Sequence, residues 1–241
     1  MYKYCEEKRN EAKIMIALQT LPQIITAIGG LGTAAFGLVD ATKVLGGGVN
    51  HIGFKGIRTT VTILTPAGQA TNALPQKKIL ATLQANWMNG TDLGSQKSIA
   101  KSLIKLNLNA GNAAALAAAT GVDAAVLTAV ATSIAAGTPL TSAESDVFSR
   151  FDLIVTALLD ETYQRSDQAY RNGTRALAMV ISVGLALAGG YILHTAGTVW
   201  TGQDIAEPFL IGLLATPLAP IAKDLSTALA TAVNTLQLVK K

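Results

Sequence analysis

The side chains that do most enzyme and metal chemistry are few in this chain and far apart. It has two histidines, His51 and His194, and a single cysteine, Cys5. Because no His-x-x-x-His or Glu-x-x-His pair occurs, neither a zinc-protease motif nor a di-metal carboxylate site is predicted. One cysteine can neither close a disulfide within the chain nor supply a multi-cysteine metal site. We therefore expect no catalytic residue, no metal site and no cofactor.

A glycine-rich stretch, GGLGTAAFG at 29–37, allows two interpretations. The spacing of Gly30, Gly32 and Ala35 matches a dinucleotide-binding fingerprint, which needs a preceding strand and an acidic residue about twenty positions further on. The apolar run before the glycines is long for a strand, however, and position 55 is a lysine. Small residues four positions apart instead let helices pack closely in lipid. The sequence favours this packing face, formed by Gly29, Thr33, Gly37 and Ala41.

A second stripe of small residues precedes one of the histidines. It consists of Ala178, Ser182, Ala186 and Gly190, and His194 follows four positions later on the same helical face. A histidine near the end of a membrane helix can relay protons, line a pore or bind a metal, but one hydrogen bond between helices is the simpler expectation.

Two amides, Gln19 and Gln23, lie one helical turn apart in the first apolar stretch. Amides in hydrocarbon seek polar partners, so we expect them to face protein or water. They are candidate polar contacts in the membrane, either between helices or around a pore.

Composition indicates the environment of the chain. Of its 241 residues, 50% are hydrophobic and only 14% charged, against about 25% charged in soluble domains. Three uncharged apolar stretches, at 14–39, 176–203 and 208–222, are near the roughly 17–25 residues that cross a bilayer. The acidic residues before the first stretch, and its length, favour an anchor over a cleaved signal peptide. The net charge of +4 is scattered, so no nucleic-acid partner is expected.

The distribution of basic residues predicts a topology. Of the 19 lysines and arginines, 12 lie between Lys43 and Arg175, and none lies at 176–222. By the positive-inside rule the central region and the C-terminus face the cytoplasm, and the loop at 197–208 faces outward. We expect a plasma membrane of bacterial type. Whether 14–39 crosses once or re-enters at Pro22, and hence the side of the N-terminus, stays open, with a single crossing favoured.

Between the apolar stretches the sequence predicts helices separated by breakers. The β-branched run at 59–65 suggests at most a short strand or a loop. Residues 95–136 suggest three short helices, with Ser95, Asn112 and Asp123 as possible caps and Gly137 as a stop. A capping-box pattern at Thr141–Glu144 then begins a long helix. No proline interrupts this helix before the second span, and Gly173 is the expected place for a bend.

These observations predict an all-α integral membrane protein with about three transmembrane helices, a small cytoplasmic helical subdomain and one long helix that continues into the second span. The leading functional hypothesis is a non-enzymatic, oligomeric scaffold or subunit of a larger membrane complex. A pore lined by Gln19, Gln23, Ser182 and His194 is the alternative, and a membrane-bound enzyme comes third. The predicted partners are the lipid bilayer and further copies or other membrane subunits. The expected segments are an N-terminal segment with the first span (1–42), a Gly/Pro-punctuated membrane-surface linker (43–94), the helical subdomain (95–172), a transmembrane hairpin (173–223) and an amphipathic C-terminal helix (224–241).

Overall fold

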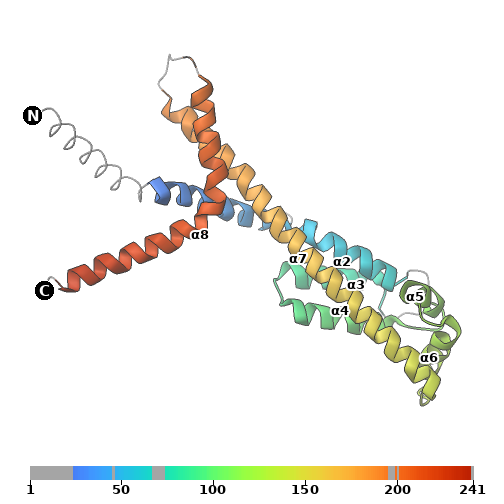
Figure 1. The fold of residues 1–241 in the computed structure, drawn as a ribbon. Helices are drawn as coiled ribbons and strands as arrows, with labels where there is room; N and C mark the ends of the chain where they lie inside the picture. Colours follow the sequence, from blue (N-terminus) through green and yellow to red (C-terminus); the bar gives the residue numbers. More distant parts are fainter. Residues whose placement is uncertain (1–23, 45–46, 67–73, 195–198, 200, 240–241) are drawn as a thin grey trace, which may run out of the picture. The chain divides into compact units, whose positions relative to one another are not determined.

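All the regular structure that could be described in this chain is α-helical (Figure 1). The computed structural model describes residues 24–44, 47–66, 74–194, 199 and 201–239, and no strand occurs among them. This confirms the predicted all-α class. The described helices are Ile24–Val44, α2 (Asn50–Leu64), α3 (Gln76–Met88), α4 (Leu93–Asn107), α5 (Ala113–Thr120), α6 (Ala124–Ala136), α7 (Ser142–Leu193) and α8 (Gly202–Val239).

The chain forms two compact units. The first, called here the apolar unit, comprises Met1–Gly46 and Gly173–Lys241, and the second, the helical unit, comprises Gly47–Asn172. Helix α7 contributes residues to both units and passes through Gly173 as one helix. A bend was expected at Gly173, but α7 is not interrupted there.

The helical unit packs α2, α3 and α4 beside the N-terminal half of α7 (Figure 1). Four buried residues of α7 recur at every fourth position, which gives the helix one continuous apolar face toward the other helices. They are Phe151, Val155, Leu159 and Tyr163. Facing side chains from the shorter helices complete the core, among them Phe54, Ile57, Val61, Ile79, Leu83 and Ile104.

The expectation of a strand or loop at 59–65 is wrong, because residues 59–64 continue helix α2, which ends before Thr65. Threonine is tolerated in this helix since its hydroxyl can donate to a carbonyl of the preceding turn. Thr59 Oγ1 donates to the Lys55 carbonyl at 3.1 Å, and Thr62 Oγ1 donates to the Arg58 carbonyl at 2.7 Å. Helices α2 and α3 both contribute to the core of the helical unit, which begins at Gly47.

The ends of the short helices follow local capping chemistry. Asp92, not Ser95, caps α4, because its carboxylate accepts the Ser95 N–H at 2.9 Å. Asp123 caps α6 as predicted, accepting the Val126 N–H at 2.8 Å. The predicted stop at Gly137 is also confirmed, with a left-handed φ of 67° that favours glycine.

Helix α7 begins at the predicted capping box. The Thr141 N–H donates to Glu144 Oε2 at 2.7 Å, and the Glu144 N–H returns a bond of 3.4 Å to Thr141 Oγ1. Hydrogen bonds from the Thr141 backbone and hydroxyl hold the pKa of Glu144 below its usual value. From this start α7 runs for 52 residues.

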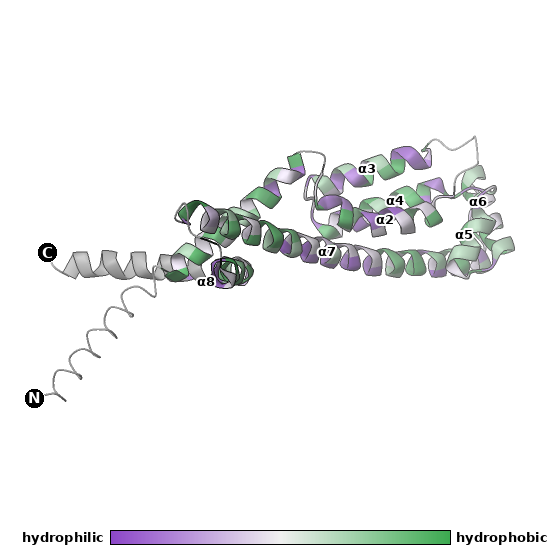
Figure 2. Cartoon of the chain, turned by 90° about the horizontal axis from the view of Figure 1, so that it is seen from above, coloured by the Kyte–Doolittle hydropathy of each residue, from purple (hydrophilic) through white to green (hydrophobic). Residues whose placement is uncertain are grey.

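Three helices are long and apolar enough to cross a membrane: Ile24–Val44, Ser142–Leu193 through its apolar end, and Gly202–Ile221 within α8. The predicted number of apolar helices is thereby confirmed. Figure 2 shows hydrophobic residues dominating the C-terminal part of α7, whereas its middle is largely polar. Pro22, Gln19 and Gln23 lie outside the described residues, so a single crossing of the first stretch stays a prediction.

Helix α8 contains Pro208, Pro217 and Pro220. An interior proline removes one backbone hydrogen bond and pushes against the preceding turn, which bends a helix. Figure 1 shows α8 as a bent helix, consistent with the kink expected from these prolines.

Candidate functional site

Ser182, the polar member of the second small-residue stripe, lies in the contact between α7 and α8. Its side chain is buried, and its hydroxyl lies 2.7 Å from the Gly212 carbonyl oxygen and 3.2 Å from the Thr216 hydroxyl. A Cβ on Gly212 would stand 2.5 Å from the Val183 Cα. The backbones of α7 and α8 therefore approach closely where Gly212 faces Ser182. The hydroxyls of Ser182 and Thr216 form a hydrogen bond across this contact.

The remaining members of this stripe follow the same helix. Ala178 is buried, whereas Ala186 is half-buried. A Cβ on Gly190 would meet Pro208 Cγ at 2.7 Å. Ala178, Ser182 and Gly190 thus take part in packing within one chain. Helix α8 contacts α7 at Ser182 and Gly190.

The helix Ile24–Val44 packs through a face other than the predicted one. Its buried positions are Gly29, Gly32, Ala35 and Val39. A Cβ on Gly32 would overlap the Ala215 carbonyl oxygen and stand 3.0 Å from the Ala219 Cβ. This helix therefore rests on α8 through a row that includes Gly32, a glycine that the predicted packing face leaves out.

The opposite face of this helix is open. Thr33, Gly37 and Ala41 are exposed, and a Cβ on either Gly30 or Gly37 would meet no described atom within 4 Å. Of the four predicted packing residues only Gly29 is buried. Whether the other three pack against another chain stays a prediction.

Neither histidine has two further His, Cys, Asp or Glu side chains placed to share a metal ion among the described residues. His194 is half-buried at the end of α7, where its backbone N–H donates to the Gly190 carbonyl at 3.0 Å, and His51 is exposed in α2. Among the described residues no group of three His, Cys, Asp or Glu side chains could hold a metal ion. Gln19, Gln23 and Cys5 lie outside the described residues.

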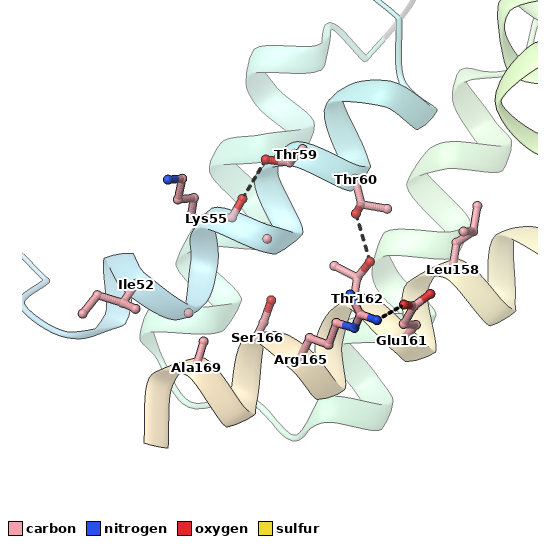
Figure 3. A pocket seen from close by; sticks show the side chains of 12 residues that line it. Ile52, Lys55, Thr59, Thr60, Leu158, Glu161, Thr162, Arg165, Ser166 and Ala169 are labelled. Carbon is pink, nitrogen blue, oxygen red and sulfur yellow. Dashed lines mark hydrogen bonds and ion pairs between the residues drawn. The ribbon is translucent and has the colours of Figure 1, made fainter. Parts of the chain in front are cut away.

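A groove of about 520 Å³ runs between α2 and α7 in the helical unit (Figure 3). The two helices lie close together at the bottom of the groove because α2 carries glycines there. A Cβ on Gly56 would stand 2.9 Å from Ser166 Oγ, and one on Gly53 would stand 3.0 Å from the Ser166 carbonyl oxygen. The polar residues that line the groove are Lys55, Thr59 and Thr60 of α2 and Glu161, Thr162, Arg165 and Ser166 of α7.

The hydroxyls of the groove are only partly satisfied. Thr60 Oγ1 and Thr162 Oγ1 share one hydrogen bond of 2.9 Å. Ser166 is only 2% exposed, and its Oγ has no hydrogen-bond partner among the described residues. A buried hydroxyl without a partner costs about 1–3 kcal/mol. Gln96 Oε1 and the Tyr163 hydroxyl are likewise buried without a hydrogen-bond partner among the described residues.

The charges of the groove come from both helices. Arg165 is paired with Glu161 at 2.9 Å on α7, and both side chains are largely exposed. Helix α2 contains no acidic residue, and Lys55 makes no ion pair with any described residue. The other cation of α2, Arg58, lies over the Phe54 ring at 5.5 Å. The lining thus contains two basic residues, Lys55 and Arg165, and one acidic residue, Glu161.

The charges between α4 and α7 are, by contrast, matched. Lys97 binds Asp160 at 2.6 Å, and Lys101 and Lys105 both bind Asp152, at 2.7 and 2.9 Å. These contacts fasten two helices of the core. We interpret this α4–α7 ion ladder as structural.

Comparisons of the chain with protein families, with curated proteins and with solved structures found no match in any of the three.

Sequence reasoning missed the groove because α2 was expected to be a linker. A usable pattern was present: Gly53, Gly56 and Thr60 on one helix, and Thr162, Ser166 and Ala169 on the other, recur at helical spacing. What the sequence alone does not give is that these two rows, more than one hundred residues apart, face each other.

Proposed function

We propose that the chain is an integral membrane protein whose three apolar helices anchor it in lipid. We further propose that it acts without catalysis, as an oligomeric scaffold or as a subunit of a larger membrane complex. The observation that carries this proposal is the exposure of large apolar side chains in the apolar unit.

That exposure is unusual for a surface in water. The exposed apolar residues of α7 and α8 in this unit include Val180, Tyr191, Ile192, Leu193, Phe209, Leu210, Leu214 and Ile221. Contiguous apolar surface of this kind marks an interface with protein or lipid. Because these residues lie on helices of membrane-crossing length, lipid is the partner that we propose.

The proposed orientation follows from the basic residues. With the central region cytoplasmic, the helical unit would lie on the inner side of a bacterial plasma membrane. Helix α7, which contributes residues to both units, would then connect the cytoplasmic part to the membrane.

The proposed assembly uses the open face of the helix Ile24–Val44. This face consists of Gly30, Thr33, Gly37 and Ala41, whose side chains are small, and it lies opposite the face that packs on α8. Small residues allow close contact between membrane helices. We therefore propose that a helix of another subunit packs there.

The pore alternative receives less support. Ser182 is bonded to Gly212 and Thr216 in the contact of α7 with α8, so in this packing its hydroxyl is not available to line a water path. The amides at Gln19 and Gln23 lie outside the described residues, and the pore remains an untested alternative.

Measurement of the mass of the complex, extracted in mild detergent or in native nanodiscs, tests the assembly. We expect a mass of more than one chain, and a lower mass for Gly37→Leu, because the larger side chain would separate the helices. Ala188→Leu is the matched control, since Ala188 is exposed on α7 outside the open face. A monomeric wild-type protein would overturn the assembly proposal, and an unchanged mass for Gly37→Leu would overturn the proposed face.

A further inference from the structure

Helix α7 has two different faces in the helical unit. The face formed by Phe151, Val155, Leu159 and Tyr163 is buried in the core, and α2, α3 and α4 lie on that side of the helix (Figure 2). The opposite face, called here the outer face, consists of the exposed residues Asp146, Arg150, Leu153, Ala157, Glu161 and Arg165. We propose that the outer face binds a second copy of the chain, with the two α7 helices antiparallel.

The outer face has the composition of a contact between proteins. At about 100° per residue its positions fall within an arc of about 120°, and the core residues of α7 lie outside that arc. Apolar residues occupy its middle, where Leu153 is 70% exposed and Ala157 is also exposed. Charged residues lie on either side along the helix. An apolar centre inside a polar rim is typical of a protein–protein interface.

The order of the charges identifies the partner. Asp146 and Arg150 precede the apolar centre, and Glu161 and Arg165 follow it. In a second copy that is turned end for end and centred between residues 155 and 156, Glu161 lies level with Arg150 of the first copy, and Arg165 lies level with Asp146. Two-fold symmetry repeats both pairs, so every charge of the outer face meets an opposite one. A parallel pair in register would instead place like charges together.

The charges of the outer face are available to a partner. Asp146 and Arg150 are four positions apart, but they form no ion pair with each other or with any other described residue. Glu161 binds Arg165 at 2.9 Å, and these side chains are 55% and 78% exposed. A surface pair of this kind is worth little, so both side chains can turn to a partner at small cost.

The apolar centre is also self-complementary in size. In the same register the half-buried Ile154 lies level with Ala157 of the second copy, so a large side chain meets a small one on both sides of the symmetry axis. Leu153 lies level with Leu158, which is partly buried against the core. Alternation of large and small residues lets facing helices interdigitate.

The direction of the pairing has a consequence for its setting. The apolar end of α7 is its C-terminal end, so the apolar ends of an antiparallel pair point in opposite directions (Figure 2). Under the proposed membrane function the contact would therefore join copies anchored in facing bilayers, and this consequence alone rests on that function. The outer face itself is independent of the proposed contact at Gly37, which lies in the apolar unit.

Cysteine cross-linking of the full chain in detergent tests the pairing, because chains can meet there in either direction. Cys5→Ser removes the only cysteine, and Ala157→Cys or Gln164→Cys then introduces one at an exposed position of α7. In the antiparallel register the two copies of position 157 are about 5 Å apart along the helix axis, and those of position 164 about 25 Å. We expect a disulfide-linked dimer for Ala157→Cys and little for Gln164→Cys. No dimer at position 157, or equal dimer at both positions, would overturn the proposal.

Reversal of the charges tests the register. In the Ala157→Cys protein, Arg150→Glu and Glu161→Arg should each slow dimer formation about tenfold, because each places like charges together at two symmetry-related positions. The double variant restores opposite charges and should return the rate to within about twofold. Lys77→Glu is the matched control, because it makes the same change in net charge as Arg150→Glu at an exposed position of α3, and it should change the rate less than about twofold. A double variant as slow as the single variants would overturn the pairing.

Two further measurements separate this contact from the proposed membrane assembly. Gly37→Leu should leave the cross-link at position 157 unchanged, and a missing cross-link while Gly37→Leu still lowers the mass of the complex would refute the α7 contact alone. Lipid vesicles that carry the chain should cluster, as followed by turbidity, and Arg150→Glu should reduce the clustering. Vesicles that stay separate although the cross-link forms in detergent would overturn the arrangement in facing bilayers.

Discussion

At the scale of single residues, Asp152 pairs with more charged side chains than any other described residue of the helical unit. It accepts hydrogen bonds from both Lys101 and Lys105. We expect Asp152→Asn to lower the apparent free energy of unfolding by about 1–2 kcal/mol, because two part-buried ammonium groups lose the negative charge that they share and one of the two acceptor oxygens. The control Asp167→Asn breaks a surface pair with Arg171 and should cost less than about 0.5 kcal/mol. Chemical denaturation of both variants in detergent checks the difference, and equal losses would contradict it.

Asp152 also predicts a dependence of stability on pH. Partial burial raises the pKa of its carboxyl, but the bonds and charges of Lys101 and Lys105 outweigh burial and lower the pKa below 3.8. A carboxyl with a lower pKa in the folded state stabilises the fold fully above its unfolded pKa, and the contribution disappears as pH falls through the folded value. The stability difference between the wild type and Asp152→Asn should therefore be constant from about pH 5 to pH 7 and shrink below about pH 4. A difference that stays constant down to pH 2 would contradict this assignment.

Gly53 is required by packing and not by backbone conformation. A Cβ at this position would overlap Trp87 Cζ2 and would stand 2.9 Å from the Tyr170 Cβ. We expect Gly53→Ala to destabilise the helical unit by about 1–3 kcal/mol through overpacking. Gly184→Ala is the control, because a Cβ there meets no described atom within 4 Å. Thermal unfolding of both variants measures the contrast, which would fail if Gly53→Ala were as stable as its control.

At the scale of elements, the ion ladder between α4 and α7 has one unfilled position. The two helices run in opposite directions, because Lys97 pairs with Asp160 and Lys105 pairs with Asp152. Thr156, midway between the two aspartates, is therefore the residue opposite Lys101, which reaches to Asp152 instead. Thr156→Glu should stabilise the protein by about 0.5 kcal/mol more than Thr156→Gln, which has the same shape and helix propensity without the charge.

Salt provides the check on this prediction. Because the gain is electrostatic, the difference between the Glu and Gln variants should shrink at about 1 M salt. If Thr156→Gln is as stable as Thr156→Glu at low salt, repulsion from Asp152 and Asp160 cancels the attraction of Lys101, and the prediction is wrong.

Some elements could be predicted from the sequence, and others could not, for identifiable physical reasons. Asp123 and Thr141 form their capping hydrogen bonds with residues three positions away, so the local sequence was sufficient to predict both helix starts. Helix α2 was missed because β-branched residues and glycines lower local helix propensity, whereas burial of Phe54, Ile57 and Val61 against distant helices overrides it.

The two small-residue stripes show a further reason. Residues four positions apart advance by about 40° more than a full turn, so a stripe of four members winds around the helix. In the helix Ile24–Val44 this drift carries the predicted face from the buried Gly29 to the exposed Ala41. The spacing indicated that helices could approach closely, but it did not determine which side meets a partner.

At the scale of the whole molecule, two exposed leucines, one in each unit, allow exposure to lipid to be distinguished from exposure to water. Leu210 of α8 is 57% exposed, and Leu153 of α7 is 70% exposed in the helical unit. If the apolar unit lies in a bilayer, Leu210→Lys should oppose insertion by about 3 kcal/mol. Leu153→Lys should be neutral within about 0.5 kcal/mol.

Membrane insertion of the two variants in cells, measured by resistance to alkaline extraction, checks this contrast. We expect a reduced membrane fraction for Leu210→Lys alone. Equal membrane fractions for both variants and the wild type would argue against lipid around α8.

Composition predicted the three apolar helices because hydropathy is a property of each stretch by itself. The groove could not be predicted in this way, because it exists only where Thr60 meets Thr162 across the fold. The same limit applies to Ser166, whose unsatisfied hydroxyl is visible only once its neighbours are known.

The arrangement of small residues on α8 has a consequence for biogenesis. Gly212 and Thr216 meet α7, while Ala215 and Ala219 meet the helix Ile24–Val44, so one short stretch holds both other apolar helices. Because α8 follows both of these helices in the chain, the ribosome makes this stretch after them. The first apolar helix therefore waits without its partner in the chain while residues 45–201 are synthesised. During that interval its glycine faces are open to the translocation machinery, to chaperones and to neighbouring nascent chains.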